Sequence, residues 1–99
     1  WLMGFMQVKI RLMGTLRQVS GVDKIVLENE SIQCVMDSIK LMVSNYPALE
    51  KELFDPLLNT PEPNALILLD GVEINNLNGM DTSIKDGSEL VFLSVTHGG

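Results

Sequence analysis

The order of apolar and polar positions predicts strands at the start of the chain. Residues 6–12 alternate apolar and polar side chains, which is the period of a strand with one face turned inward. A second apolar run at 24–27 follows across a loop that contains Gly14, Ser20 and Gly21. The two runs together predict an N-terminal β-hairpin.

A helix is predicted from Ser31 onward. Ser31 is typical of an N-cap, and the acidic Glu28 and Glu30 beside it favour the positive end of a helix dipole. Apolar side chains then recur at the helical spacing i, i+3, i+4 and i+7, and these are Ile32, Val35, Met36, Ile39, Met42, Val43 and Tyr46. Pro47 ends this stripe, because the residue before a proline disfavours helical dihedrals. Residues 47–54 then predict one short accessory helix.

The second half of the chain predicts a hairpin and a closing strand. The most apolar run, 65–69, is followed by the Asp-Gly pair at 70–71, a strong hairpin signal, and by a returning strand at 72–74. Prolines mark 55–64 as a loop, and the last strand is expected at 89–95. This order predicts an α+β fold, a ββαββ roll with a mixed sheet, one main helix across it and the short accessory helix.

The last strand has an unusual pattern, because all four residues at 90–93 are apolar. Successive strand residues point to opposite faces, so this strand is either buried on both sides or meets a partner on its second face. One helix covers only one face of a small sheet. The uncovered face is therefore a candidate docking surface.

Length and charge narrow the class of protein. A chain of 99 residues with 45% hydrophobic and 20% charged residues fits one domain, expected at 6–95, with 1–5 as a tag remnant or an upstream extension. No apolar stretch approaches the roughly 20 residues of a membrane span, and 1–5 lack the basic region of a signal peptide. The net charge of −6 argues against direct nucleic-acid binding and suits a basic partner.

Side chains suited to catalysis are few. His97, the only histidine, lies in the tail, so we expect no Ser/His/Asp arrangement. Cys34 is the only cysteine, which excludes an internal disulfide, and no group of side chains has metal-ligand spacing. Glycine-rich nucleotide loops are absent from the sequence. Cys34 is expected to be a buried or half-buried structural thiol. We therefore expect an intracellular, cytoplasmic protein that is not an enzyme and holds no cofactor or metal.

After the last strand the sequence closes with Thr96, His97, Gly98 and Gly99. Consecutive glycines have no side chains to pack and lose the most backbone freedom when ordered. Residues 96–99 therefore predict a flexible tail. This tail is either a frayed end or a segment that threads a narrow slot and presents its carboxylate to a partner.

The pattern as a whole resembles the ubiquitin-like sulfur carriers. This group includes the ubiquitin-related modifier, the archaeal small modifiers, the thiamine-pathway sulfur carrier and the small subunit of molybdopterin synthase. The matching segments are 8–12, 31–32, 45–47, 68–74 and, most specifically, 84–93 followed by 97–99. The His-Gly-Gly ending is most similar to the ubiquitin-related modifier. The resemblance implies a ubiquitin-like β-grasp roll.

The resemblance also implies a function carried by the tail. An ATP-dependent activating enzyme would adenylate the carboxylate of Gly99, with Gly98 beside it, to give a thiocarboxylate or a conjugate with target lysines. This chemistry would serve tRNA thiolation or protein modification. The residues implied to contact the partner are Val91, Leu93, Val95 and His97. Two alternatives stay open: the small subunit of molybdopterin synthase, and a ubiquitin-like interaction module with an inert tail. The sulfur acceptor, whether tRNA, a pterin precursor or a thiazole, also stays open.

Overall fold

The computed structural model describes residues 6–54 and 63–94. The predicted extension at 1–5 and the predicted tail at 96–99 lie outside these residues, as does most of the predicted loop at 55–64. The elements follow in the order β1 (Met6–Met13), α1 (Thr15–Ser20), β2 (Lys24–Asn29), α2 (Val35–Asn45), α3 (Ala48–Leu53), β3 (Ala65–Leu69), β4 (Val72–Glu73), the 3-10 turns η2 (Ile74–Asn76) and η3 (Gly79–Asp81), and β5 (Glu89–Ser94).

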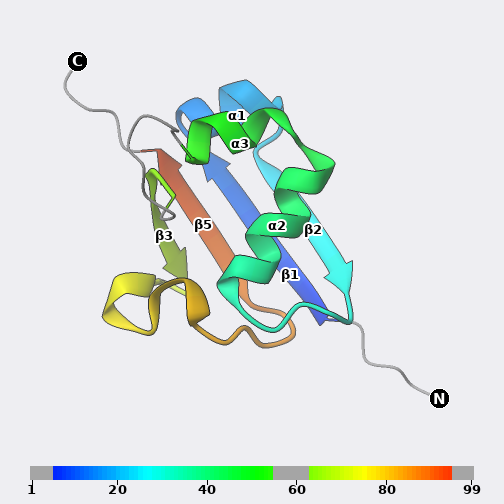
Figure 1. The fold of residues 1–99 in the computed structure, drawn as a ribbon, viewed down its shortest axis with the longest axis vertical. Helices are drawn as coiled ribbons and strands as arrows, with labels where there is room; N and C mark the ends of the chain where they lie inside the picture. The colour runs from blue at the N-terminus through cyan, green and yellow to red at the C-terminus, as the bar shows by residue number, and fades with distance from the viewer. Residues whose placement is uncertain (1–5, 55–62, 95–99) are drawn as a thin grey trace.

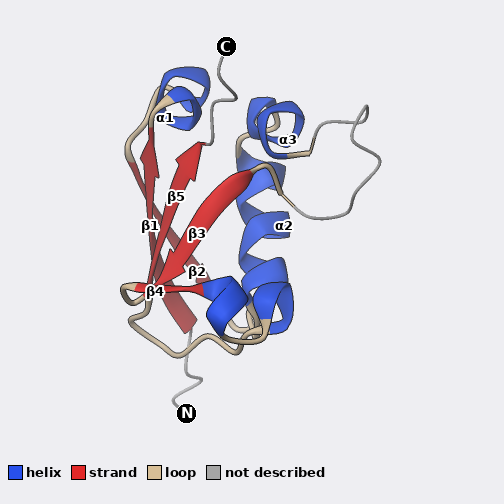
Figure 2. Cartoon of the chain, turned by 90° about the vertical axis from the view of Figure 1, so that its left-hand side faces the viewer, coloured by secondary structure: helices blue, strands red, loops and turns tan. Residues whose placement is uncertain are grey.

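The five strands form one mixed sheet in the order β2-β1-β5-β3-β4. The central strands β1 and β5 run parallel, and the other neighbouring strands are antiparallel. Helix α2 lies across one face of the sheet, while α1 and α3 lie together at one end of it (Figures 1 and 2). This arrangement confirms the predicted α+β β-grasp roll with a mixed sheet and one main helix, and its five strands are one more than the predicted ββαββ order counts.

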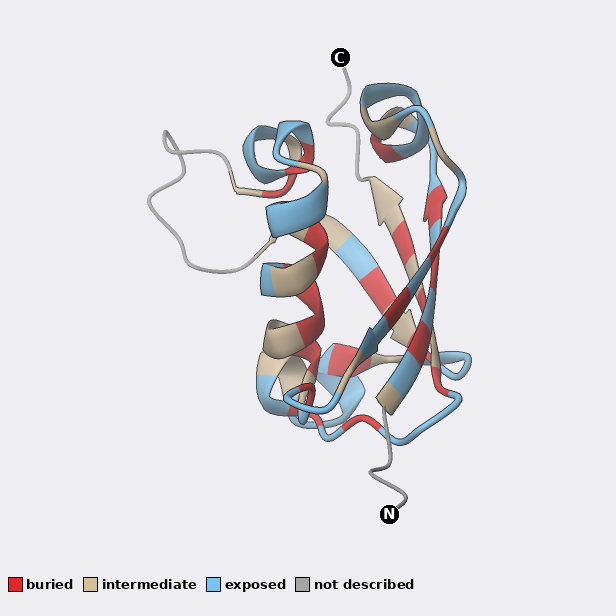
Figure 3. Cartoon of the chain, turned by 90° about the vertical axis from the view of Figure 1, so that its right-hand side faces the viewer, coloured by how far each residue is buried: buried red, intermediate tan, exposed pale blue. Residues whose placement is uncertain are grey.

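The hydrophobic core lies between the sheet and α2. Alternate residues of β1 and β5 are buried, and the buried positions of α2 lie on the side of the helix that faces the sheet (Figure 3). The fully buried residues of these three elements are at most 1% exposed, and the largest are Ile10, Leu12, Ile39, Met42, Leu90 and Phe92. The strand period predicted at 6–12 is therefore confirmed, with polar residues on the opposite face.

The main helix begins later than predicted, because Ser31 is not its N-cap. Cys34 occupies that position. The amide and the hydroxyl of Ser31 both donate to the side-chain oxygen of Asn29, at 2.8 and 2.5 Å. The carboxylate of Asp37, in the first turn of α2, accepts hydrogen bonds from the backbone N–H groups of Gln33 (2.9 Å) and Cys34 (3.2 Å). A carboxylate reaching back over the first turn satisfies N–H groups that the helix leaves free.

The same contacts set the charge state of Asp37. The backbone hydrogen bond from Gln33 holds the pKa of this carboxyl below its ordinary value, and the backbone and side chain of Cys34 and the charge of Lys40 act in the same direction. Partial burial of the carboxyl acts in the opposite direction and raises its pKa. Cys34 itself is half-buried, as the sequence predicts.

The connection between β1 and β2 is the main departure from the predicted elements. It contains α1, which the sequence analysis interpreted as loop. The six residues of α1 bury only Leu16 and lie between Gly14 and Gly21, both at positive φ.

The predicted turn of the second hairpin, between β3 and β4, is confirmed. Its residues Asp70 and Gly71 both have positive φ (48° and 87°).

The strand predicted at 72–74 is one residue too long. The observed strand, β4, ends at Glu73, because η2 begins at Ile74. The predicted accessory helix is confirmed as α3, at Ala48–Leu53.

Candidate functional site

The sheet face opposite α2 carries a group of apolar side chains. We call Met13, Leu66, Leu68, Val91 and Leu93 the outer patch. Met13 is 43% and Leu66 38% exposed, and the other three are half-buried. Large apolar side chains that stay exposed side by side on a folded domain mark an interaction surface.

Strand register brings the outer patch together from three segments of the chain. Leu93 of β5 pairs with Met13 of β1 on one side and with Leu66 of β3 on the other. Val91 pairs with Leu68 in the same sheet. Cross-strand partners share a face of the sheet, so these five side chains form two adjacent rows.

Two of the residues that the sequence predicts to contact a partner, Val91 and Leu93, belong to the outer patch. Val95 and His97, also predicted to contact a partner, lie outside the described residues, as do Gly98 and Gly99 of the predicted reactive end. The sequence analysis named no residue of β1 or β3 as a partner contact. The signal for β3 was present, because the run at 65–69 is apolar at every position, as is 90–93.

Positive charge lies beside the outer patch on the same face. Arg11 pairs with Val91 on one side and with Lys24 on the other, and Lys9 is the next outward-facing residue of β1. All three cations are exposed, with Glu89 opposite Lys9. This part of the sheet face is therefore locally positive, unlike the acidic balance of the whole chain, and the prediction of a basic partner stays untested.

The last strand ends beside the outer patch. Strand β5 ends at Ser94, one residue after Leu93, at the end of the sheet where α1 and α3 lie (Figure 1). The side-chain oxygen of Ser94 accepts a hydrogen bond from the backbone N–H of Thr15 at 3.0 Å. The described part of β5 thus ends beside the outer patch.

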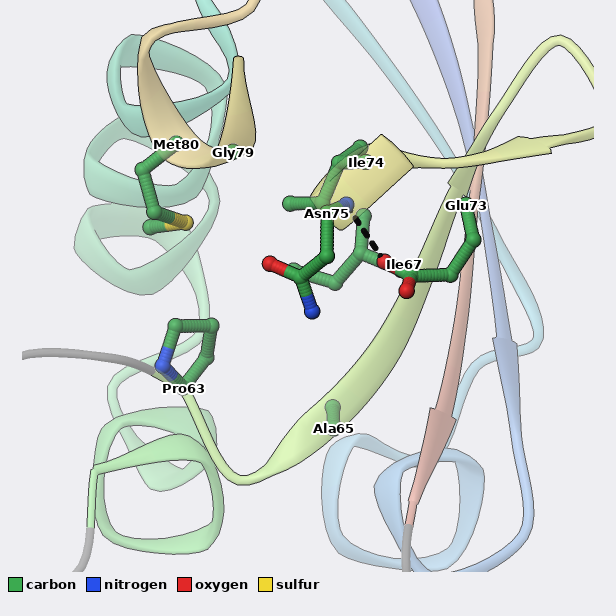
Figure 4. Close-up of a pocket in the computed structure, with 8 residues that line it drawn as sticks. All are labelled: Pro63, Ala65, Ile67, Glu73, Ile74, Asn75, Gly79 and Met80. Carbon is green, nitrogen blue, oxygen red and sulfur yellow. Dashed lines mark hydrogen bonds between the residues drawn. The ribbon is translucent and has the colours of Figure 1, made fainter. Parts of the chain in front are cut away.

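A small cavity of about 70 Å³ on the helix side of β3 offers no comparable chemistry (Figure 4). Its one carboxylate, that of Glu73, accepts a hydrogen bond from the backbone N–H of Asn75 at 2.7 Å and so caps η2. Within residues 6–54 and 63–94, no three His, Cys, Asp or Glu side chains are placed to hold a metal ion. None of the helices described is long and apolar enough to cross a membrane.

The family of the chain follows from a match to the model of Urm1, the ubiquitin related modifier, over residues 7–99. This match includes the outer patch and the final two glycines. The chain belongs to the Urm1 family. Urm1-family proteins are small ubiquitin-like carriers rather than catalysts, and they lie in the ubiquitin-like sulfur-carrier superfamily.

Solved structures place the Urm1-family chain among similar folds. The small archaeal modifier protein 1 of Methanosarcina acetivorans is 28% identical with a TM-score of 0.78, over 97% of this chain and 99% of that one. Urm1 of Trypanosoma brucei is 20% identical with a TM-score of 0.71, over 99% and 100%.

A third similar structure is a complex of two proteins. It holds subunits 1 and 2 of the molybdopterin-converting factor of Helicobacter pylori, and its matching chain is 16% identical with a TM-score of 0.55, over 95% of this chain and 100% of that one. No curated protein sequence matches.

Proposed function

We propose that this Urm1-family chain is a sulfur carrier and protein modifier that acts as a cosubstrate through the carboxylate of Gly99. An ATP-dependent activating enzyme docks on the outer patch and receives the tail that follows Ser94. The observation that carries the proposal is the family match over residues 7–99, which takes in Gly98 and Gly99. The chain needs no catalytic side chain of its own for this role.

The proposed chemistry takes place at one carboxylate. A carboxylate oxygen of Gly99 attacks the α-phosphorus of ATP, and pyrophosphate leaves. The resulting acyl-adenylate is a mixed anhydride, and attack on its carbonyl by a hydrosulfide-level sulfur nucleophile releases AMP and leaves a thiocarboxylate. Attack by a lysine amine of a target protein instead leaves an isopeptide bond. Glycines at 98 and 99 give the partner's active site unhindered access to the carbonyl.

The position of Ser94 limits where the partner's active site can lie. Five residues follow Ser94. A fully extended chain spans at most 3.3–3.6 Å per residue, so the Gly99 carboxylate reaches no more than about 18 Å from the end of β5. The docking surface and the adenylation site of the activating enzyme must therefore be close neighbours.

The direct test is the intact mass of the chain after incubation with the activating enzyme and ATP. We expect the mass of an adenylyl group to be added, or one oxygen to be replaced by sulfur when a sulfur donor is present. A chain that lacks Gly98 and Gly99 is the negative control. An unchanged mass, with an enzyme that activates another member of the family, would overturn the proposal.

A second test distinguishes docking on the outer patch from docking elsewhere on the same sheet face. Leu66→Asp places a charge in the outer patch, and Val26→Asp places the same charge on β2, at a residue that is 54% exposed on the same face. We expect Leu66→Asp to lose activation and Val26→Asp to keep it. Equal losses would show that the patch is not the specific docking surface.

The small subunit of molybdopterin synthase is the second candidate, favoured by the similarity to the Helicobacter pylori complex. This role uses the same thiocarboxylate, with the tail inserted into a larger catalytic subunit. Stable co-purification with such a subunit, together with pterin product and no protein conjugates, would favour it over the first candidate.

An inert interaction module is the remaining alternative. Removal of Gly98 and Gly99 distinguishes it, because full activity of the shortened chain in its cell would be consistent with this role alone.

A further inference from the structure

A side chain holds the last described residue of β5 to the start of α1. The hydrogen bond from the Thr15 N–H to the Ser94 oxygen, 3.0 Å long, joins residues that are 79 positions apart. Gly14 makes this approach possible. Its φ of 67° and ψ of −137° lie where side chains are rarely tolerated, and a Cβ there would come within 2.6 Å of the Ser94 oxygen. We call the contact of Ser94 with Gly14 and Thr15 the Ser94 latch.

The latch lies just beyond the point where the backbone pairing of β5 with β1 stops. The parallel pairing of β1 with β5 ends at Met13 and Leu93, one residue before the latch. On its other side Ser94 pairs with Ala65 of β3. The end of β5 is thus held by the first residue of α1 on one side and by β3 on the other, where the last residue of a strand would otherwise fray.

We propose that Ser94 is a positioning residue for the reaction at the chain terminus. This inference rests on the proposed function. The latch fixes Ser94, after which the last five residues of the sequence begin, relative to the outer patch. A partner bound to the patch then has a defined starting point from which to bring the Gly99 carboxylate to its adenylation site. Without the latch, the end of β5 separates from β1 more often, and a docked chain spends less time in a reacting geometry.

The side of the sheet on which Ser94 lies allows an effect on the reaction rate to be separated from an effect on docking. By strand alternation its side chain is on the same side as Phe92, which is buried, and opposite to Leu93 of the outer patch. Removing the hydroxyl leaves the docking surface unchanged. The latch should therefore act on the rate of the docked complex and not on docking.

The test compares Ser94→Ala with wild type in adenylation by the activating enzyme, measured as ATP–pyrophosphate exchange over a range of concentrations of the chain. We expect kcat to fall about tenfold with KM unchanged. Ser94→Thr keeps the hydroxyl acceptor and should keep the wild-type kcat. Ser88→Ala is the matched control. It also removes a serine hydroxyl that accepts a backbone hydrogen bond, from the Lys85 N–H at 3.2 Å, but Ser88 lies just before the first residue of β5, at the opposite end of the strand from Ser94.

Amide exchange of the free chain tests the contact without any enzyme. The Thr15 amide should exchange faster in Ser94→Ala than in wild type and should be unaffected in Ser88→Ala. Unchanged exchange at Thr15 would overturn the latch itself.

Kinetic outcomes separate this proposal from the function on which it rests. A wild-type kcat and KM in Ser94→Ala, or a loss equal to that of Ser88→Ala, would overturn the positioning role alone. A wild-type chain that the enzyme does not adenylate would overturn the proposed function and the positioning role with it, while exchange at Thr15 would still decide whether the contact exists.

Discussion

The exposed side chains of the outer patch allow the docking energy to be worked out in advance. Leu66 is 38% and Met13 43% exposed in the free chain. Complete burial of a side chain of this kind contributes about 1.5–3 kcal/mol. The exposed part of Leu66 can therefore contribute about 0.6–1.1 kcal/mol when a partner covers it, and that of Met13 about 0.6–1.3 kcal/mol.

Truncation of these side chains should weaken docking by the corresponding factors. Leu66→Ala is expected to raise the Kd for the activating enzyme about three- to sixfold. The double variant with Met13→Ala should raise it about eight- to sixtyfold, if the two contributions add. Titration calorimetry with the enzyme and the full chain measures both values.

Controls separate docking from folding. Leu66→Ala also removes the buried part of the side chain, so urea unfolding must show that each variant is folded at the assay temperature. Val26→Ala truncates a residue of greater exposure on the same sheet face, outside the patch, and should bind like wild type. If the double variant binds like wild type while Val26→Ala binds weakly, the reasoning is refuted and the partner binds the β2 side.

Three further predictions concern helix capping, backbone conformation and charge. Asp37→Ala should lower the free energy of unfolding by about 1 kcal/mol at neutral pH. The pKa of Asp37 is lower in the folded chain than its ordinary value of 3.8. The carboxylate therefore contributes fully to the free energy of unfolding above pH 3.8, and this contribution is lost as the pH falls through the folded pKa. The urea midpoints of variant and wild type should converge in acid. Gly14→Ala should lower the free energy of unfolding by about 2 kcal/mol or more, and Gly71→Ala should lower it by about 1 kcal/mol. Both glycines have positive φ, but only a Cβ at Gly14 would also meet Ser94. Urea unfolding of the two variants checks that Gly14→Ala is the less stable one. Arg11, Lys9 and Lys24 make the face beside the outer patch locally positive, so we expect an acidic surface of the activating enzyme to meet it. Arg11→Glu should then raise the Kd for the enzyme about fivefold and reduce its salt dependence, as measured at two ionic strengths. A wild-type affinity that rises with salt would contradict this expectation.

Local patterns were sufficient for most of the fold. The alternation at 6–12 is a property of neighbouring residues, and the helical stripe and the Asp-Gly turn are equally short in range. The errors occurred where two local signals compete. Ser31 and Asp37 both offer oxygens to free helix N–H groups, and the structure uses Asp37. Helix α1 was missed because six residues between two glycines carry too little periodicity to distinguish a helix from a loop.

The candidate site was predictable only in part, because much of it depends on strand register. Val91 and Leu93 could be identified from a strand that is apolar on both faces. Their neighbours Met13 and Leu66 come from segments about 50 residues apart, and only the pairing with β5 places them together. No local rule relates Gly14 to a serine 80 positions later, so the latch is visible only in the folded chain.

The place of β5 in the sheet gives a physical reason why this fold suits a protein that reacts at its own terminus. An edge strand has one neighbour, and its last residues are free to separate from the sheet. Strand β5 is central, with β1 on one side and β3 on the other, so its final residue can be held from both sides. The parallel pairing with β1 also brings the start of α1 next to the end of β5, where the Thr15 N–H is free to bind Ser94. A carrier whose reactive group lies beyond the last strand gains a defined starting point for its tail from this strand order, although the reactive group itself needs no side chain.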